Sequence, residues 1–273
     1  MMSWSFALPA PGPAPSVRQR GTWPGRPAAI RFVVTCEHGG NRIPPRYRDI
    51  FHGSAALLRT HRGYDIGALA MARDLAATLD TPLFAATVSR LLVDLNRSIG
   101  HPRLYSEFTR PAAPDLRQEI LAQHYRPYRD AVEACILEAI AQGHCVIHVS
   151  SHSFTPQLDG TVRNTDIGLL YDPRRRAESA FCRRWQAALR AGAPQLRTRL
   201  NYPYAGQSDG FTVYLRRRFP PGRYLGIEIE INQKHARAGA RHWRQVRAAV
   251  VDALRETAAS LSIDMPARYG GAA

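Results

Sequence analysis

Short runs of apolar and β-branched residues alternate along this chain with longer segments that have helical spacing. The runs cover residues 30–35, 82–88, 145–150, 166–171 and 224–231, and the helical segments cover residues 65–79, 115–142, 177–191 and 237–261. Runs that are apolar throughout are typical of strands buried on both faces, and parallel strands need a crossover helix between them. The alternation predicts an α/β domain with a mostly parallel sheet, in which the second helical segment bends at Pro127 and ends at Gly143.

One domain accounts for most of the 273 residues. No linker interrupts the pattern after residue 29, so we predict a single domain over residues 29–273. Residues 1–28 are rich in Pro, Ala and Gly, and the prolines at positions 9, 11, 13 and 15 would interrupt the apolar segment of a signal peptide. We expect residues 1–28 to form a disordered N-terminal extension.

Charge and cysteine content narrow the possible classes of function. The net charge is +15, but Lys234 is the only lysine, and the arginines are scattered rather than gathered in one stripe. A nucleic-acid partner is therefore not expected. No apolar run approaches the roughly 20 residues that span a bilayer. The four cysteines lack the paired spacing of a structural zinc site or a redox motif. We expect a cytoplasmic protein with reduced thiols and no membrane association.

Polar side chains stand at the ends of the predicted strands. Glu37 and His38 end the first strand, residues 90–97 follow the second, His152 ends the third, and Glu230 lies near the end of the last. Ligands of an open α/β sheet sit beyond the carboxyl ends of its strands, so these side chains should share one site. Nitrogen and oxygen ligands, a proton-accepting carboxylate and nearby cations suit a zinc-assisted hydrolysis of an amide.

Six stretches, taken together, resemble the N-formylglutamate amidohydrolase family. They are CEHGGNRIP at 36–44, YDIGA at 64–68, SRLLVDLNR at 89–97, SHSF at 151–154, NYPYAG at 201–206 and GIEIE at 226–230. The resemblance implies a zinc-carboxypeptidase-like fold, a three-layer α/β/α arrangement with helices on both faces of a mixed sheet. It also implies removal of the N-acyl group from an acidic amino acid, so that N-formyl-L-glutamate yields formate and glutamate.

The resemblance implies that His38 and His152 bind Zn²⁺ or another divalent metal ion. Zinc carboxypeptidases carry a glutamate three residues after their first histidine, and Asn41 stands at that position here. We therefore expect Asp65 to be the third ligand, with Glu37 as the second choice. In the competing interpretation, Asp65 only caps the helix that it begins.

Glu228 and Glu230 lie on the same face of a buried strand, because side chains two residues apart point in the same direction. Burial of two carboxylates is unfavourable unless a metal ion, an arginine or a shared proton compensates their charge. Glu230 matches the family's carboxylate and is expected to be the general base, whereas Glu228 is expected to pair with an arginine. The resemblance implies that Asn96 and Arg97 hold the α-carboxylate of the substrate. Arg90 is then available to stabilise the oxyanion, which is the role we expect, or to bind a second carboxylate.

Other residues have structural interpretations. In the structural interpretation of the motif at residues 89–97, its charged side chains shape the loop as an ion-pair cluster and do not contact the substrate. These side chains are Arg90, Asp94 and Arg97. Asn201 and the turn at residues 204–206 are expected to add to the wall of the substrate pocket. His148 is expected to be a hydrogen-bonded histidine of the core rather than a ligand.

Other functions remain open from the sequence. A zinc amidase or carboxypeptidase-like hydrolase for another N-acyl or peptide substrate would use the same residues. A non-catalytic binding protein would keep the metal ligands without the general base, and a nucleic-acid-binding protein would gather its arginines on one surface. A serine hydrolase is disfavoured because none of the predicted strands is followed by a Gly-x-Ser-x-Gly motif, as the nucleophile elbow of such enzymes requires. We predict an enzyme whose partner is a small N-acyl amino acid.

Overall fold

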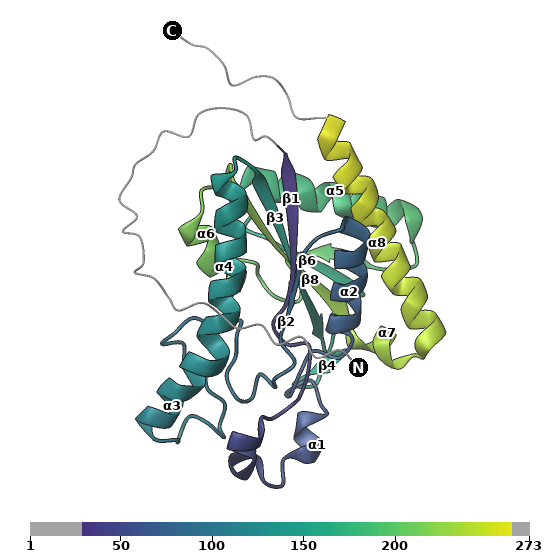
Figure 1. The fold of residues 1–273 in the computed structure, drawn as a ribbon. Helices are drawn as coiled ribbons and strands as arrows, with labels where there is room; N and C mark the ends of the chain where they lie inside the picture. Colours follow the sequence, from purple (N-terminus) through teal and green to yellow (C-terminus); the bar gives the residue numbers. More distant parts are fainter. Residues whose placement is uncertain (1–28, 264–273) are drawn as a thin grey trace, which may run out of the picture.

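A six-stranded sheet forms the centre of the computed structural model, which describes residues 29–263 (Figure 1). The predicted extension, residues 1–28, lies outside the described residues. The strands follow the order β2 (Leu83–Ala85), β1 (Ile30–Cys36), β3 (Cys145–Phe154), β8 (Tyr224–Asn232), β6 (Ile167–Leu170) and β7 (Thr198–Leu200). β6 is antiparallel to β8, whereas the other neighbouring strands are parallel. The sheet is therefore mixed and mostly parallel, as predicted.

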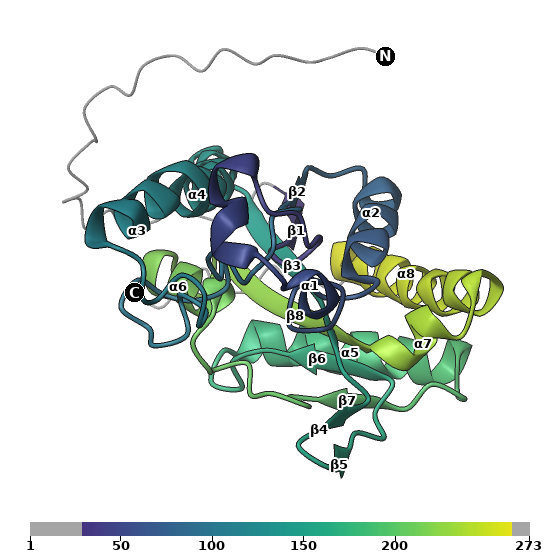
Figure 2. The ribbon, with the colours of Figure 1, turned by 90° about the horizontal axis from the view of Figure 1, so that it is seen from below.

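Helices cover both faces of the sheet, so the three-layer prediction is confirmed (Figure 2). One face is covered by α2 (Ala68–Leu79), α5 (Arg176–Gly192) and α8 (Ala240–Ile263), and the other by α4 (Arg126–Ala141) and α6 (Phe211–Arg218). The apolar sides of these helices form two cores with the sheet, because burial of apolar surface is the main driving force for folding. Trp185 and Leu254 belong to the first core, and Ile136 and Phe211 belong to the second.

The longest helix, α8, is amphipathic. Val246, Val250 and Leu254 lie one turn apart on its buried side, whereas Arg241 and Arg244 are exposed. Within residues 29–263, no helix combines the length and apolar character needed to cross a bilayer.

Shorter elements connect the layers. They are a 3₁₀ helix at Pro45–Phe51, α1 (Ala55–Leu58), α3 (Pro114–Ile120), α7 (Gln233–Arg237), and a hairpin of β4 (Gln157–Leu158) and β5 (Thr161–Val162). The segments between β1 and α4 build a third apolar cluster, in which Tyr47, Leu92 and Leu121 are buried. The connecting segments with α1 and the hairpin lie toward the carboxyl ends of β1 and β3 (Figure 1).

Some boundaries differ from those predicted. The helix expected over residues 115–142 consists of α3, a wider π-helical turn at Leu121–Tyr125, and α4. Pro127 follows that turn and has no backbone N–H to donate, so the regular hydrogen-bond ladder is interrupted there. β2 covers only three of the expected residues, because Val88 is joined to Arg42 by one isolated bridge rather than by a ladder.

His148 is a buried histidine of the core, as predicted. Its Nε2 atom lies 2.8 Å from the Thr35 hydroxyl, and its Nδ1 atom lies 2.7 Å from the Tyr224 hydroxyl. Burial lowers the pKa of the imidazole from 6.5 to about 4, although the nearby Glu37 carboxylate opposes that change. The folded protein therefore keeps His148 neutral under conditions in which the unfolded chain binds a proton.

This difference predicts a loss of stability in acid that depends on His148. Below a pH of about 6.5 the unfolded state gains a proton that the folded state refuses, so the free energy of unfolding falls by about 2 kcal/mol by pH ~5. Replacement His148→Gln should keep polar contacts but remove this proton. Urea unfolding at pH ~7 and pH ~5 should show a smaller acid loss in the variant. Equal losses in both proteins would contradict the assignment.

Candidate active site

Two histidines meet at the carboxyl ends of neighbouring parallel strands. β1 and β3 pair in register from Ile30 to Thr35, so His38, just after β1, lies beside His152 in β3. The centroids of the two rings are 5.1 Å apart. β3 continues beyond the predicted end at residue 150, because it stays paired with β8, and this pairing puts His152 opposite Glu230.

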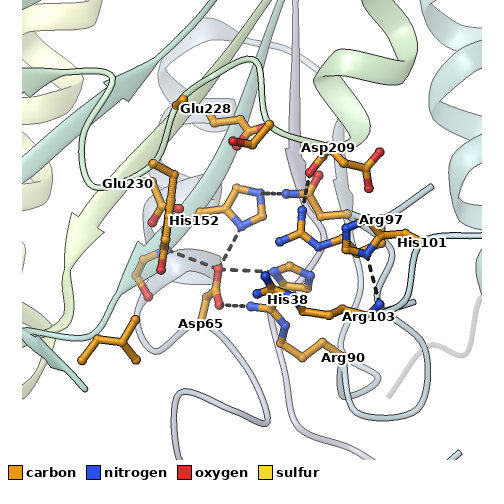
Figure 3. A pocket seen from close by; sticks show the side chains of 16 residues that line it. His38, Asp65, Arg90, Arg97, His101, Arg103, His152, Asp209, Glu228 and Glu230 are labelled. Atoms are coloured by element: carbon orange, nitrogen blue, oxygen red, sulfur yellow. Dashed lines mark hydrogen bonds and ion pairs between the residues drawn. The ribbon is translucent and has the colours of Figure 1, made fainter. Parts of the chain in front are cut away.

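Asp65 lies between the two imidazoles (Figure 3). Its Oδ2 atom is 2.9 Å from Nδ1 of His152 and 3.4 Å from Nδ1 of His38. The backbone N–H of Asp65 donates to the carbonyl of His38 at 2.9 Å, which fixes the Asp65 loop against the end of β1. All three side chains are buried, and one ligand atom from each lies within 4.8 Å of the others. The structure therefore brings together the three residues expected to hold a metal ion.

The carboxylate of Asp65 does not cap a helix. α2 begins after Gly67, and no side chain caps its first turn. Burial opposes the ionised form of Asp65, but His38, His152 and Arg90 hold its pKa well below the usual range. The competing interpretation of Asp65 as an N-cap is wrong.

The remaining nitrogen of each histidine has its own partner. Nε2 of His38 lies 2.7 Å from Oδ1 of Asp94. Nε2 of His152 lies 2.9 Å from the Ser150 hydroxyl and 3.2 Å from Oε2 of Glu37. Since hydrogen bonds to the far nitrogen fix the tautomer and orientation of a histidine ligand, both Nδ1 atoms are directed toward Asp65.

Glu37, the second choice for the third ligand, lies behind His152. Its carboxylate accepts hydrogen bonds from the Ser150 hydroxyl at 2.6 Å and from the Tyr128 hydroxyl at 3.1 Å. Burial opposes its ionisation, but the hydrogen bond with His152 keeps its pKa well below the usual range. Burial also opposes the charged form of His152, yet Asp65 and Glu37 raise the pKa of this histidine well above its usual value. The geometry favours Asp65 over Glu37 as the third ligand.

Arg90 is held in place by two carboxylates. Its guanidinium lies 3.2 Å from Oδ1 of Asp65 and 2.7 Å from Oδ2 of Asp94. Burial disfavours the charge, but Asp94 and Asp65 raise the pKa of Arg90 above its usual value. The expected ion-pair cluster is thus present for Arg90 and Asp94, whereas the Arg97 guanidinium donates to the backbone carbonyl of Asp209.

Glu230 and Glu228 both reach the pocket from β8. Glu230 is 6% exposed, and its Oε2 atom is buried without a hydrogen-bond partner in the described part of the chain. Burial raises the pKa of Glu230 from 4.5 to about 8, despite the nearby His152. Glu228 accepts a hydrogen bond from the Thr212 hydroxyl at 2.6 Å. Among the described residues Glu228 forms no ion pair, so the expected arginine partner is not found.

A pocket of about 410 Å³ contains these groups. Asn96 and Arg97 line it, as expected, and the Asn96 amide nitrogen lies 3.3 Å from Nε2 of His152. Asn201 does not line it: its side-chain oxygen accepts the backbone N–H groups of Tyr171 and Gly206. Asn201 therefore shapes the loop at residues 201–206, and that loop supplies the pocket wall.

Sequence reasoning missed several lining residues. They are His101, Arg103, Leu158, Ser208 and Asp209. Leu158 lies in the short strand β4, and the other four lie in loops. The only signal that could have found His101 and Arg103 is their position within six residues after the motif at 89–97.

Solved proteins share the fold of this chain, and a family model matches its sequence. A family model for N-formylglutamate amidohydrolase matches residues 30–237. A gene product of Agrobacterium tumefaciens is 29% identical, with a TM-score of 0.73, over 85% of this chain and 91% of that chain. An N-formylglutamate amidohydrolase from Ralstonia eutropha is 17% identical, with a TM-score of 0.63, over 86% of this chain and 95% of that chain. None of the curated proteins matches the chain.

The family match spans most of the chain and includes every residue of the His38, Asp65 and His152 cluster as well as Glu230. The chain belongs to the N-formylglutamate amidohydrolase family and is a hydrolase of amide bonds.

Proposed function

We propose that this protein is a metal-dependent amidohydrolase that removes the acyl group from an N-acyl acidic amino acid, with N-formyl-L-glutamate as its substrate. The observation that carries the proposal is the unpartnered carboxylate oxygen of Glu230, buried in the same pocket as the His38, Asp65 and His152 cluster. Family membership supports an amide bond as the target. The arginines that line the pocket support an acidic substrate.

The three clustered residues fit a divalent metal ion. Tetrahedral zinc with bonds of 2.0–2.2 Å separates neighbouring ligand atoms by about 3.3–3.6 Å. The distance from Oδ2 of Asp65 to Nδ1 of His38, 3.4 Å, lies in this range, and the distance to Nδ1 of His152, 2.9 Å, is somewhat shorter. Two imidazoles and one carboxylate are also a usual donor set for catalytic zinc. His38, Asp65 and His152 would hold the ion, which when bound acts as a Lewis acid on the acyl carbonyl and increases the acidity of water.

Glu230 supplies the proton transfer. In its ionised form Glu230, whose pKa burial raises to about 8, is a stronger base than an ordinary glutamate, and Oε2 has no competing donor in the described structure. Glu230 takes a proton from the attacking water and later gives it to the leaving nitrogen. The leaving group then departs as a neutral amine rather than as an unstable anion.

Residues 90–97 contribute two sets of side chains that bind negative charge on the substrate. Arg90 remains cationic between Asp65 and Asp94, and it stabilises the oxyanion that develops on the acyl oxygen. Asn96 and Arg97 bind the α-carboxylate. The Asn96 side chain is already positioned for this task, because its Oδ1 atom accepts the backbone N–H of Phe211 at 2.6 Å.

Removal of the Glu230 carboxylate tests the proposed reaction. Zinc-loaded Glu230→Gln should lose about 10²- to 10⁴-fold in kcat for N-formyl-L-glutamate, because general acid–base catalysis is lost. The metal content, measured by elemental analysis, should stay unchanged. The assay follows release of primary amine with and without a chelator.

Glu228→Gln is the matched control, because it removes a carboxylate two residues away on the same face of β8. Its loss of kcat should be much smaller than that of Glu230→Gln. A wild-type protein whose amine release persists in excess chelator would contradict metal dependence. Full activity in Glu230→Gln would contradict the role of the base.

Asp94 offers a second test, which reads metal binding directly. Asp94→Asn removes the anionic partner of Nε2 of His38, so zinc affinity should fall about 10- to 100-fold. Competition with a chromophoric chelator measures the affinity. Asp209→Asn is the control, since Asp209 lines the pocket but binds the backbone and hydroxyl of Ser98 instead of a histidine. Equal zinc affinity in wild type and Asp94→Asn would be inconsistent with this arrangement.

A further inference from the structure

One side of the pocket carries a cation, Arg103, to which the proposed reaction gives no role. Arg90 is engaged by Asp65 and Asp94, and Arg97 donates to a backbone carbonyl. Arg103 lines the same pocket, and its guanidinium forms no hydrogen bond or ion pair with any described residue. The guanidinium of Arg103 can therefore donate hydrogen bonds to an incoming anion.

His101 adds a donor beside Arg103. Nδ1 of His101 accepts the backbone N–H of Arg103 at 3.1 Å, so the proton of the ring lies on Nε2. Nε2 can therefore donate a hydrogen bond to an anion in the pocket. Figure 3 shows Arg97, His101 and Arg103 on one side of the pocket and Glu228 and Glu230 on the opposite side, with His152 between them.

The segment that carries these donors is anchored at both ends. The Ser98 backbone N–H and hydroxyl donate to the Asp209 carboxylate at 3.0 and 2.5 Å. Leu104 is 3% exposed in the apolar cluster, and its carbonyl accepts the backbone N–H of Asp94 at 2.9 Å. Because the backbone is fixed before a ligand arrives, less entropy is lost when Arg103 binds an anion.

We propose that Arg103 and His101 bind the side-chain carboxylate of the substrate amino acid and so determine the preference for an acidic side chain. This inference rests on the proposed function, in which Arg97 holds the α-carboxylate. Glu228 and Glu230 repel carboxylates from the opposite side, so a substrate with two carboxylates turns both toward Arg97 and Arg103.

The test compares N-formyl-L-glutamate with N-formyl-L-glutamine, whose side chain has the same length but ends in a neutral amide instead of a carboxylate. Arg103→Gln should lower kcat/KM for the glutamate substrate about 10- to 100-fold and leave that for the glutamine substrate nearly unchanged. His101→Gln should have a smaller effect in the same direction. Arg110→Gln is the control, because it removes an exposed charge of the same loop that does not line the pocket. Equal losses for both substrates in Arg103→Gln would overturn the proposal.

A binding measurement separates this inference from the proposed reaction. Titration calorimetry on zinc-loaded protein should show tighter binding of glutarate, with two carboxylates, than of butyrate, with one, and Arg103→Gln should remove the difference. If wild type hydrolyses neither formyl substrate but keeps this Arg103-dependent preference, the proposed function fails and the carboxylate subsite stands. A preference for glutarate that survives in Arg103→Gln, or none in wild type, would refute the subsite.

Discussion

The buried carboxylate of Asp65 is the interaction on which the arrangement of the site depends. It contacts a histidine after β1, a histidine within β3 and the guanidinium of Arg90, and so joins three segments distant in sequence. A buried ion is strongly unfavourable unless opposite charge and hydrogen bonds compensate it. Asp65 therefore stays ionised only because these segments converge on it, and they can converge only because β1 and β3 are parallel neighbours in the sheet.

The pocket divides its charge between two chemical tasks. β8 presents carboxylates, of which Glu230 has the raised pKa of a base, and the loop after β2 presents the arginines. Proton transfer and anion recognition would interfere if these charges were mixed, because a nearby arginine lowers the basicity of a carboxylate. Asp94 connects the two tasks, since one of its oxygens contacts His38 and the other contacts Arg90.

The sequence predicted the strands that position the site, because long apolar runs such as those of β3 and β8 have few alternatives to a buried strand. It missed β7, with three residues at the sheet edge, and α6, whose final turn is Arg216 to Arg218. Neither element carries enough periodic apolar residues to be recognised. The long predicted helix was also interrupted, because hydrogen bonding around Pro127 depends on the surrounding structure.

The site residues show the same limit. Strand-end positions indicated His38, His152 and Glu230, but the choice between Asp65 and Glu37 depends on which nitrogen of each histidine faces which carboxylate. Sequence spacing has no information about that orientation. Asn201 was expected in the pocket, yet its amide is used by backbone N–H groups of its own loop. Arg103 belongs to a loop whose path is set by the burial of Leu104, a tertiary contact.

The most direct measurement is anomalous diffraction at the zinc absorption edge from crystals of the zinc-loaded protein. The ligand geometry predicts one strong peak within about 2.0–2.2 Å of Nδ1 of His38, Nδ1 of His152 and a carboxylate oxygen of Asp65. The Glu230 carboxylate should lie nearby without being a fourth protein ligand. A zinc peak bound by other residues, or no peak between these three, would contradict the assignment of the site.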